Sequence, residues 1–306
     1  MKPPLQERFQ IYVVGPNQDS RLTTVAAGAV IEEVTLQLDS DAPFYLRGRA
    51  LRHAYTSALT QGNLQGVKSR FAGPDRNYKQ QDFLLESLSM VYYGQGGNPK
   101  PIAPQVLYPA NSVLQFDVSN TGANSISNLT FYFIGVKLFP LGSVVGYTYP
   151  KRIDRTQTFA YPIPVTALGV SEVRQNQIFT CKQDADFVIR AMQGPVISSS
   201  AGRTRAEIAI VLKDWDKKPY MNDAVHFDIL GGNGATPANI PVGPTPSYVQ
   251  PFGTGPGQPG LFYPEIYLPK NHQILYDVYR TDGSGGSNQA EDFTFNLIGA
   301  KVFEGA

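Results

Sequence analysis

Cysteine and charge are scarce in this sequence. Of its 306 residues only Cys181 is a cysteine, so there can be no internal disulfide and no paired-cysteine metal or redox motif. Asp, Glu, Lys and Arg together make up 17% of the chain, and the formal net charge is +1. A chain this close to neutral lacks the broad basic surface that proteins use to hold nucleic acid, so we expect no nucleic-acid partner.

Long apolar runs and helical stripes are scarce too. No apolar run approaches the ~18 residues that a membrane-spanning helix needs, so we expect no membrane partner. Residues 1–20 lack the apolar run and cleavage site of a signal peptide. Arg47–Gly62 is the best helix candidate, and a strand that ends in a polar loop is the alternative. Abundant Gly and Pro, with 17 Tyr and 17 Phe, are typical of many short strands joined by tight turns.

The chain contains the same three blocks twice, in the same order. The pairs are Asp41–Arg47 with Asp184–Arg190, Ala103–Val118 with Tyr263–Val278, and Leu129–Phe139 with Phe293–Phe303. Two copies are too few for a solenoid, so tandem complete domains are the simpler interpretation. The sequence therefore predicts a first domain over 1–145 with an N-terminal arm, a linker over 146–158, and a second domain over 159–306.

The repeated blocks alternate between apolar and polar residues, as strands do. In Leu129–Phe139 the period is two up to Gly135, where we predict a bulge that moves the apolar face to the other side, and Gly299 repeats the feature. In the preceding strand of the first copy, Val113–Val118, the inward-facing residues are predicted to be Leu114, Phe116 and Val118. With roughly seven to nine strands per half, we predict an all-β fold of two tandem antiparallel β-sandwich, jelly-roll-like domains related by internal duplication.

Residues 231–260 form an insertion in which Gly and Pro fill half of the positions. Such a composition cannot bury a core of its own. Its apolar anchors are Ile240, Tyr248, Val249 and Phe252. They are predicted either to pack on their own domain or to form a partner-contact arm that reaches a neighbouring subunit.

The sequence offers no convincing catalytic or metal motif. His53, His226 and His272 are not spaced as ligands. Cys181 alternates with Phe179, which indicates a buried structural thiol. Gly94–Lys100 lacks the ending of a phosphate-binding loop. We therefore expect no enzyme activity, no cofactor and no metal.

One acidic cluster leaves alternatives open. Asp214, Asp216 and Asp223 surround the single tryptophan, Trp215. A charged turn is the plainest interpretation. Calcium binding by the carboxylates or stacking of Trp215 on a sugar ring are the alternatives.

The repeated block resembles blocks in virion structural proteins of tailed bacteriophages. In those proteins an "FDV" or "YDV" strand leads to a final strand with Gly, Lys and Phe at set positions. Here Phe116–Val118 precedes Phe131–Phe139, and Tyr276–Val278 precedes Phe295–Phe303. The resemblance covers roughly the second half of each repeat. It implies a jelly-roll capsid cement, decoration or minor capsid protein and brings no catalytic residues with it.

The expected function is therefore that of a non-enzymatic virion protein, made in the host cytoplasm, that stabilises the shell by bridging neighbouring subunits. Its expected partners are other copies of itself and the major capsid protein or another virion protein. The alternatives are a phage neck, tail or baseplate component, a carbohydrate- or receptor-binding β-sandwich with a glycan partner, and a double-jelly-roll major capsid protein.

Overall fold

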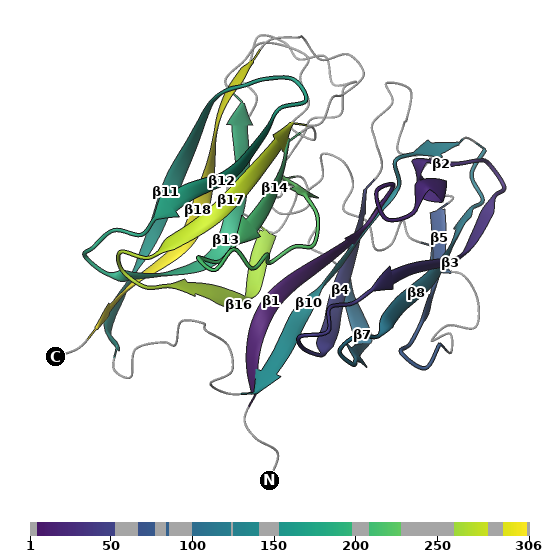
Figure 1. Ribbon diagram of the computed structural model, residues 1–306, viewed down its shortest axis with the longest axis horizontal. Coiled ribbons are helices and arrows are strands. Elements are labelled where there is room, and N and C mark those ends of the chain that lie inside the picture. The colour runs from purple at the N-terminus through teal and green to yellow at the C-terminus, as the bar shows by residue number, and fades with distance from the viewer. Residues whose placement is uncertain are drawn as a thin grey trace. The chain divides into compact units, whose positions relative to one another are not determined.

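The computed structural model describes residues 5–52, 67–76, 84–85, 100–123, 125–140, 153–197, 208–227, 260–280 and 290–304. These residues form two compact units, one holding β1 to β10 and the other β11 to β18 (Figure 1). No helix in the described ranges is long and apolar enough to cross a membrane.

The first unit contains two four-stranded antiparallel sheets, ordered β1-β10-β4-β7 and β3-β8-β5-β6, and a small β2–β9 pair. Its elements are β1 Leu5–Val14, the 3-10 helix η1 Ser20–Thr23, β2 Thr24–Val25, β3 Val30–Gln37, β4 Phe44–Arg52, β5 Val67–Ala72, β6 Leu84–Leu85, β7 Lys100–Tyr108, β8 Val113–Asn120, β9 Ile126–Ser127 and β10 Thr130–Pro140. The first six residues of the helix candidate, from Arg47 to Arg52, therefore belong to strand β4.

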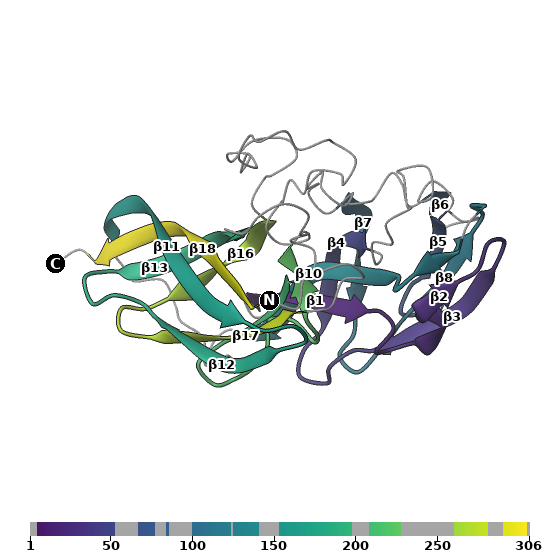
Figure 2. The same ribbon diagram turned by 90° about the horizontal axis from the view of Figure 1, so that it is seen from above.

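The second unit also contains two four-stranded antiparallel sheets, ordered β11-β18-β13-β16 and β12-β17-β14-β15. Its strands are β11 Ile153–Leu168, β12 Val173–Thr180, β13 Asp186–Ile197, β14 Ile208–Lys213, β15 Val225–His226, β16 Gly260–Leu268, β17 Gln273–Arg280 and β18 Glu291–Glu304. The two sheets lie as two layers (Figure 2). Aromatic side chains such as Tyr276 and Phe295 meet between them, with ring centroids 5.4 Å apart.

The strand order is the same in both units. If the short pair β2 and β9 is set aside, the described residues of each unit form eight strands, and numbering them along the chain gives the sheets 1-8-3-6 and 2-7-4-5 in both. Eight antiparallel strands arranged in two sheets in this way form a jelly roll. The prediction of an all-β, tandem β-sandwich fold is confirmed, whereas an origin by duplication stays a prediction.

The predicted linker was partly wrong. Strand β11 begins at Ile153, inside the segment 146–158 that the sequence assigns to a linker. The sequence from Ile153 to residue 158 does not alternate between apolar and polar residues. These residues are strand nevertheless, because β18 lies beside them and pairs from Ile153↔Glu304 onward. Backbone pairing with a neighbouring strand does not require alternating side chains.

The predicted bulge lies at the predicted place but in the neighbouring strand. The β10–β4 register shifts between Ile134 and Gly135, and the extra residue is Arg47 of β4. Strand β10 itself pairs with β1 without a shift. The expected change of its apolar face at Gly135 therefore does not occur. In the second unit Arg190 of β13 is the extra residue beside Gly299. Glycine is needed at this point because the backbone of the neighbouring strand comes very close.

The core of each unit lies between its sheets and is rich in aromatic residues. Leu114, Phe116 and Val118 are all fully buried, as predicted. Phe116 packs on Phe131 with ring centroids 4.7 Å apart. The matched residues of the second unit, Tyr276 and Phe295, make the same contact, so the matched core positions have alike surroundings.

Candidate functional site

The predicted partner-contact residues Ile240, Tyr248, Val249 and Phe252 lie outside the described residues. Their role as a contact arm therefore stays a prediction. His53 and Gly94–Asn98 also lie outside the described ranges.

Cys181 is buried, as expected, at 1% exposure. Its thiol lies 3.5 Å from the carbonyl oxygen of Ala185. Burial raises the pKa of the thiol to about 11, so the reactive thiolate form is rare at neutral pH. His272 is exposed in the turn before β17, and its backbone N–H donates to the Pro269 carbonyl at 3.1 Å. Ser112 makes the same turn contact with Pro109 in the first unit.

The acidic cluster forms a tight turn at the end of β14. The Asp214 carboxylate accepts the Lys218 N–H at 2.8 Å, and the Asp214 carbonyl accepts the Lys217 N–H at 3.0 Å. Asp223 accepts the N–H of Ala224. In the described part of the chain no three acidic, His or Cys side chains form a group that would hold a metal ion. The structure therefore does not bring the three carboxylates together, and Trp215 remains 44% exposed at the turn.

Each unit holds a buried lysine against an aspartate from the matched block. Lys137 Nζ lies 2.9 Å from Asp41, and Lys301 Nζ lies 2.5 Å from Asp184. The two lysine side chains are only 4% and 7% exposed, whereas the carboxylates are about half exposed. In the first unit Asp39 adds a second ion pair with Lys137 at 2.5 Å. The lysine charge is thus balanced at the rim of each sandwich.

The Asp184 pair predicts a dependence of stability on pH. The hydrogen bond from Lys301 holds the pKa of Asp184 below its usual value. Because the folded pKa is the lower one, the stabilisation is complete above the unfolded pKa of about 4 and is lost as pH falls through the folded pKa. We expect the melting temperature of the wild type to fall more steeply below about pH 4 than that of Asp184→Asn. Parallel acid melting curves measured by circular dichroism would contradict this.

Each unit also has a buried aspartate that accepts the amide N–H of a bulge residue. Asp117 of β8 accepts the Glu33 N–H at 2.9 Å, and Asp277 of β17 accepts the Asn176 N–H at 2.7 Å. Glu33 and Asn176 lie at register shifts in β3 and β12 and have φ of 53° and 52°. We call a carboxylate that takes the N–H of a bulge residue from the neighbouring strand a bulge clamp.

A cation balances each of these two clamps. Arg70 lies 2.7 Å from Asp117, and Lys213 lies 2.5 Å from Asp277. Both carboxylates are almost fully buried, at 0% and 4% side-chain exposure. A buried carboxylate is tolerated only when it is paired and hydrogen-bonded, and here both conditions are met.

Glu33 is strained, which predicts a stabilising substitution. Its positive φ disfavours a residue with a long side chain, and Asn, the residue at the matched position 176, adopts this region more readily. Glu33→Asn should raise the free energy of unfolding by ~0.5–1 kcal/mol. Urea titration would measure it. The control Glu32→Asn changes an exposed neighbour without a positive φ and should have almost no effect.

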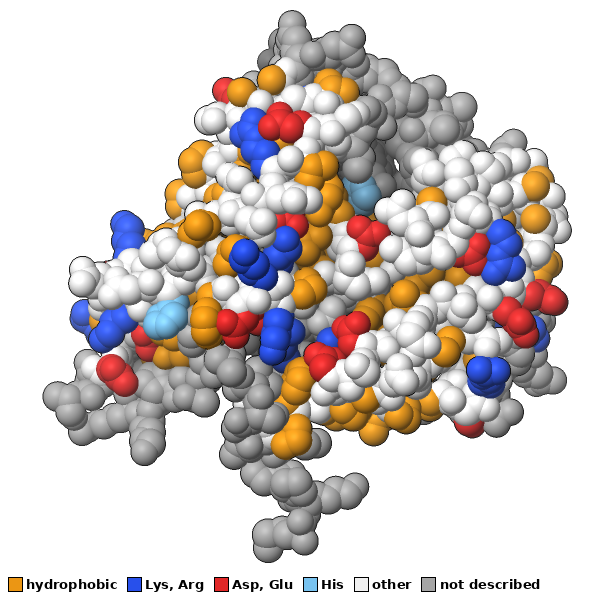
Figure 3. Space-filling model, in the orientation of Figure 1, with side chains coloured by type: hydrophobic (Ala, Val, Ile, Leu, Met, Phe, Trp, Pro, Cys, Tyr) orange, Lys and Arg blue, Asp and Glu red, His pale blue; other side chains and the backbone are white. Residues whose placement is uncertain are grey.

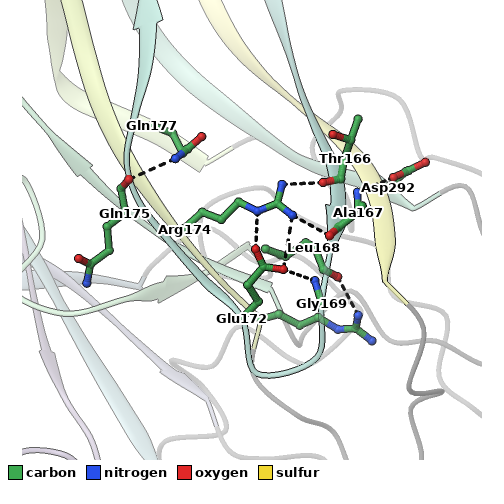
Figure 4. A network of polar contacts seen from close by, with 10 residues as sticks. Thr166, Ala167, Leu168, Gly169, Glu172, Arg174, Gln175, Gln177 and Asp292 are labelled. Atoms are coloured by element: carbon green, nitrogen blue, oxygen red, sulfur yellow. Dashed lines mark hydrogen bonds and ion pairs between the residues drawn. The ribbon is translucent and has the colours of Figure 1, made fainter.

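A third bulge clamp holds the end of β11 (Figure 4). Ala167 has φ of 50° at a register shift, and its N–H donates to the Asp292 carboxylate of β18 at 2.6 Å. Arg174 donates to the carbonyls of Thr166 and Ala167 at 2.5 and 2.6 Å. The network therefore satisfies both the amide and the carbonyls of this bulge.

Glu172 connects the same arginine to the turn after β11 (Figure 4). It lies 2.6 Å from Arg174 Nε and accepts the Gly169 N–H at 2.5 Å. Arg280 Nη1 donates to the Leu168 carbonyl at 3.0 Å. The turn between β11 and β12 is therefore held by hydrogen bonds with two side chains, between Glu172 and the Gly169 N–H and between Arg280 and the Leu168 carbonyl.

Exposed apolar side chains gather on β12 and the turn before it. Val170, Val173 and Ile178 are 38%, 44% and 58% exposed. The bulge at Asn176 is what places Val173 and Ile178 on one face, because their β17 partners, Tyr279 and Leu275, are four residues apart.

Charged side chains of both signs are scattered over the face drawn in Figure 3, with no broad patch of one sign among the described residues.

No family model and no curated protein matches this chain. Solved structures that resemble it include two viral capsid proteins. The STIV MCP is 13% identical, covers 96% of this chain and 97% of its own, and has a TM-score of 0.26. The infectious bursal disease virus VP2 subviral particle is 11% identical, covers 99% and 78%, and has a TM-score of 0.19. At these scores the likenesses support no argument about function.

Proposed function

We propose that this chain is a non-enzymatic structural protein of a virus particle and that it builds the protein shell. The observation that carries the proposal is the complete jelly-roll strand order in both units. Jelly rolls are the recurrent wall-building domains of viral capsids, although the same fold also serves as a lectin domain. The residues described in the site supply rigid turns and closed edges, and they do not form a set with roles in a reaction.

Within the shell, the tandem arrangement favours the role of the main shell subunit. A decoration or cement protein needs one surface that binds a finished shell. In this chain both units have the same eight-stranded jelly-roll fold, so each copy contributes two domains that can pack side by side in a shell. This favours the double-jelly-roll subunit over the cement or minor capsid role, and self-association with other copies of the chain follows from it.

Purified particles from the source would test the proposal. If the chain is the main shell subunit, it should be the most abundant virion protein in quantitative mass spectrometry, and no shells should form without it. If it is cement, shells should form without it and release their genome at a lower temperature. Absence of the chain from purified particles would overturn both roles.

A glycan-binding role is the second candidate, favoured by Trp215. This side chain is 44% exposed on a turn that three hydrogen bonds hold in place, two between the Asp214 backbone and its neighbours and one accepted by the Asp214 carboxylate. A rigid, exposed indole is a suitable platform for stacking a sugar ring. A glycan array probed with the wild type and with Trp215→Ala would test it. Signals that the wild type gives and the variant loses would support the role, and an array without signals would exclude it.

A further inference from the structure

Among the described residues there are three bulge clamps, and all three act on edge strands. Strands β3, β11 and β12 each lie at the edge of a four-stranded sheet. Each has a register shift at a residue with positive φ, and in each case the N–H of that residue donates to an aspartate of the neighbouring strand, at 2.9, 2.6 and 2.7 Å. The register shifts beside Arg47 and Arg190 lie in the central strands β4 and β13.

The carbonyls of the three bulges also have partners from side chains. Arg21 donates to the Glu32 carbonyl at 2.9 Å and to the Glu33 carbonyl at 3.3 Å. In β12 the Gln177 amide donates to the Gln175 carbonyl at 3.2 Å. In β11 Arg174 donates hydrogen bonds to the carbonyls of both bulge residues, Thr166 and Ala167. These are the kinds of backbone groups that a strand from another molecule would pair with.

We propose that the bulge clamps are devices that close the edge strands to strand addition. An edge strand presents unpaired N–H and C=O groups to solvent and is a template for pairing with another chain, and a bulge interrupts that template. Here the bulge is held in place by a carboxylate of the same unit. Copies of the chain therefore associate through side-chain surfaces and not by extending each other's sheets.

Strand β12 needs such protection most. It is an edge strand with exposed Val173 and Ile178, and exposed apolar edges are the ones that aggregate. Its clamp, Asp277, is buried and paired with Lys213. Removing the carboxylate frees the Asn176 N–H and leaves the left-handed conformation of that residue without its support.

The test compares variants of the full chain at two clamps. Asp277→Val removes the acceptor, whereas Asp277→Asn retains an oxygen for the Asn176 N–H. Asp292→Ala removes the β11 clamp at an exposed position, so its effect on folding should be small, with Asp292→Asn as its control. Both clamp removals should form thioflavin-binding aggregates at least ~10-fold faster than the wild type, with the ~4.7 Å strand repeat in fibre diffraction. The two Asn variants should behave as the wild type does.

A second substitution separates edge pairing from misfolding. Ile178→Lys puts a charge on the β12 edge, and edge lysines block strand pairing. Combined with Asp277→Val, it should return aggregation to the wild-type rate. If near-ultraviolet circular dichroism shows that Asp277→Val does not fold, the aggregation rate of Asp292→Ala tests the proposal instead. A folded Asp277→Val or Asp292→Ala that aggregates no faster than the wild type overturns the proposal, and so does a double variant that aggregates as fast as Asp277→Val.

Discussion

Gly299→Ala is expected to destabilise the protein by at least ~3 kcal/mol. A Cβ at this position would lie 1.7 Å from the Val188 carbonyl oxygen and 2.8 Å from its carbon. These are backbone atoms of the central strand β13, so they cannot turn away as a side chain would. The β13–β18 pairing, which runs through the middle of the sheet, would have to separate at the bulge.

Gly135→Ala should behave alike in the first unit, because its Cβ would lie 2.2 Å from the Tyr45 carbonyl oxygen. Gly15→Ala is the matched control. There the nearest atom is Thr130 Oγ1, at 2.9 Å, on a side chain that is able to rotate. Urea unfolding followed by circular dichroism would measure all three. If Gly299→Ala is as stable as Gly15→Ala, the close approach of the two strands is wrong.

Phe131→Ala and Phe295→Ala are each expected to reduce the free energy of unfolding by ~3–5 kcal/mol. Both side chains are at most 1% exposed and lie between the two sheets of their unit. Removing either ring leaves a cavity among other aromatic rings, which are too rigid to fill it. Ile178→Ala, at a 58% exposed position, is the control and should change stability by less than ~0.5 kcal/mol.

The same two variants test whether the units unfold separately. Hydrogen exchange should speed up mainly in β8 and β10 for Phe131→Ala, and mainly in β17 and β18 for Phe295→Ala. The reason is that each ring packs on an aromatic ring of its own unit, Phe131 on Phe116 of β8 and Phe295 on Tyr276 of β17. If Phe131→Ala opened β18 as much as β10, the two jelly rolls would not be separate cooperative units.

Several features could be predicted from the sequence because they depend on local pattern. Period-two alternation placed Leu114, Phe116 and Val118 in the core. A Pro-x-Asn pattern is typical of a turn, since Asn tolerates the left-handed region, and Asn111 and Asn271 have φ of 59° and 63°. In each case the residue type and its near neighbours contain the needed information.

The bulge clamps could not be found in this way. The only available signal was that Asp117 and Asp277 recur at matched positions inside an apolar strand, where an unpaired carboxylate would be unfavourable. That signal implies a partner without identifying it. The partner of Asp117, the Glu33 amide, is 84 residues away along the chain.

An all-β protein with two similar halves could be predicted from the order of the residues, because apolar–polar alternation and repeated blocks are read directly from it. Three features are set by the tertiary fold: the jelly-roll strand order, the strand in which each bulge lies, and the pairing of Lys301 with Asp184, 117 residues apart. Such pairings depend on which strands become neighbours and in which register. Both follow from the packing of the whole unit and not from any one segment.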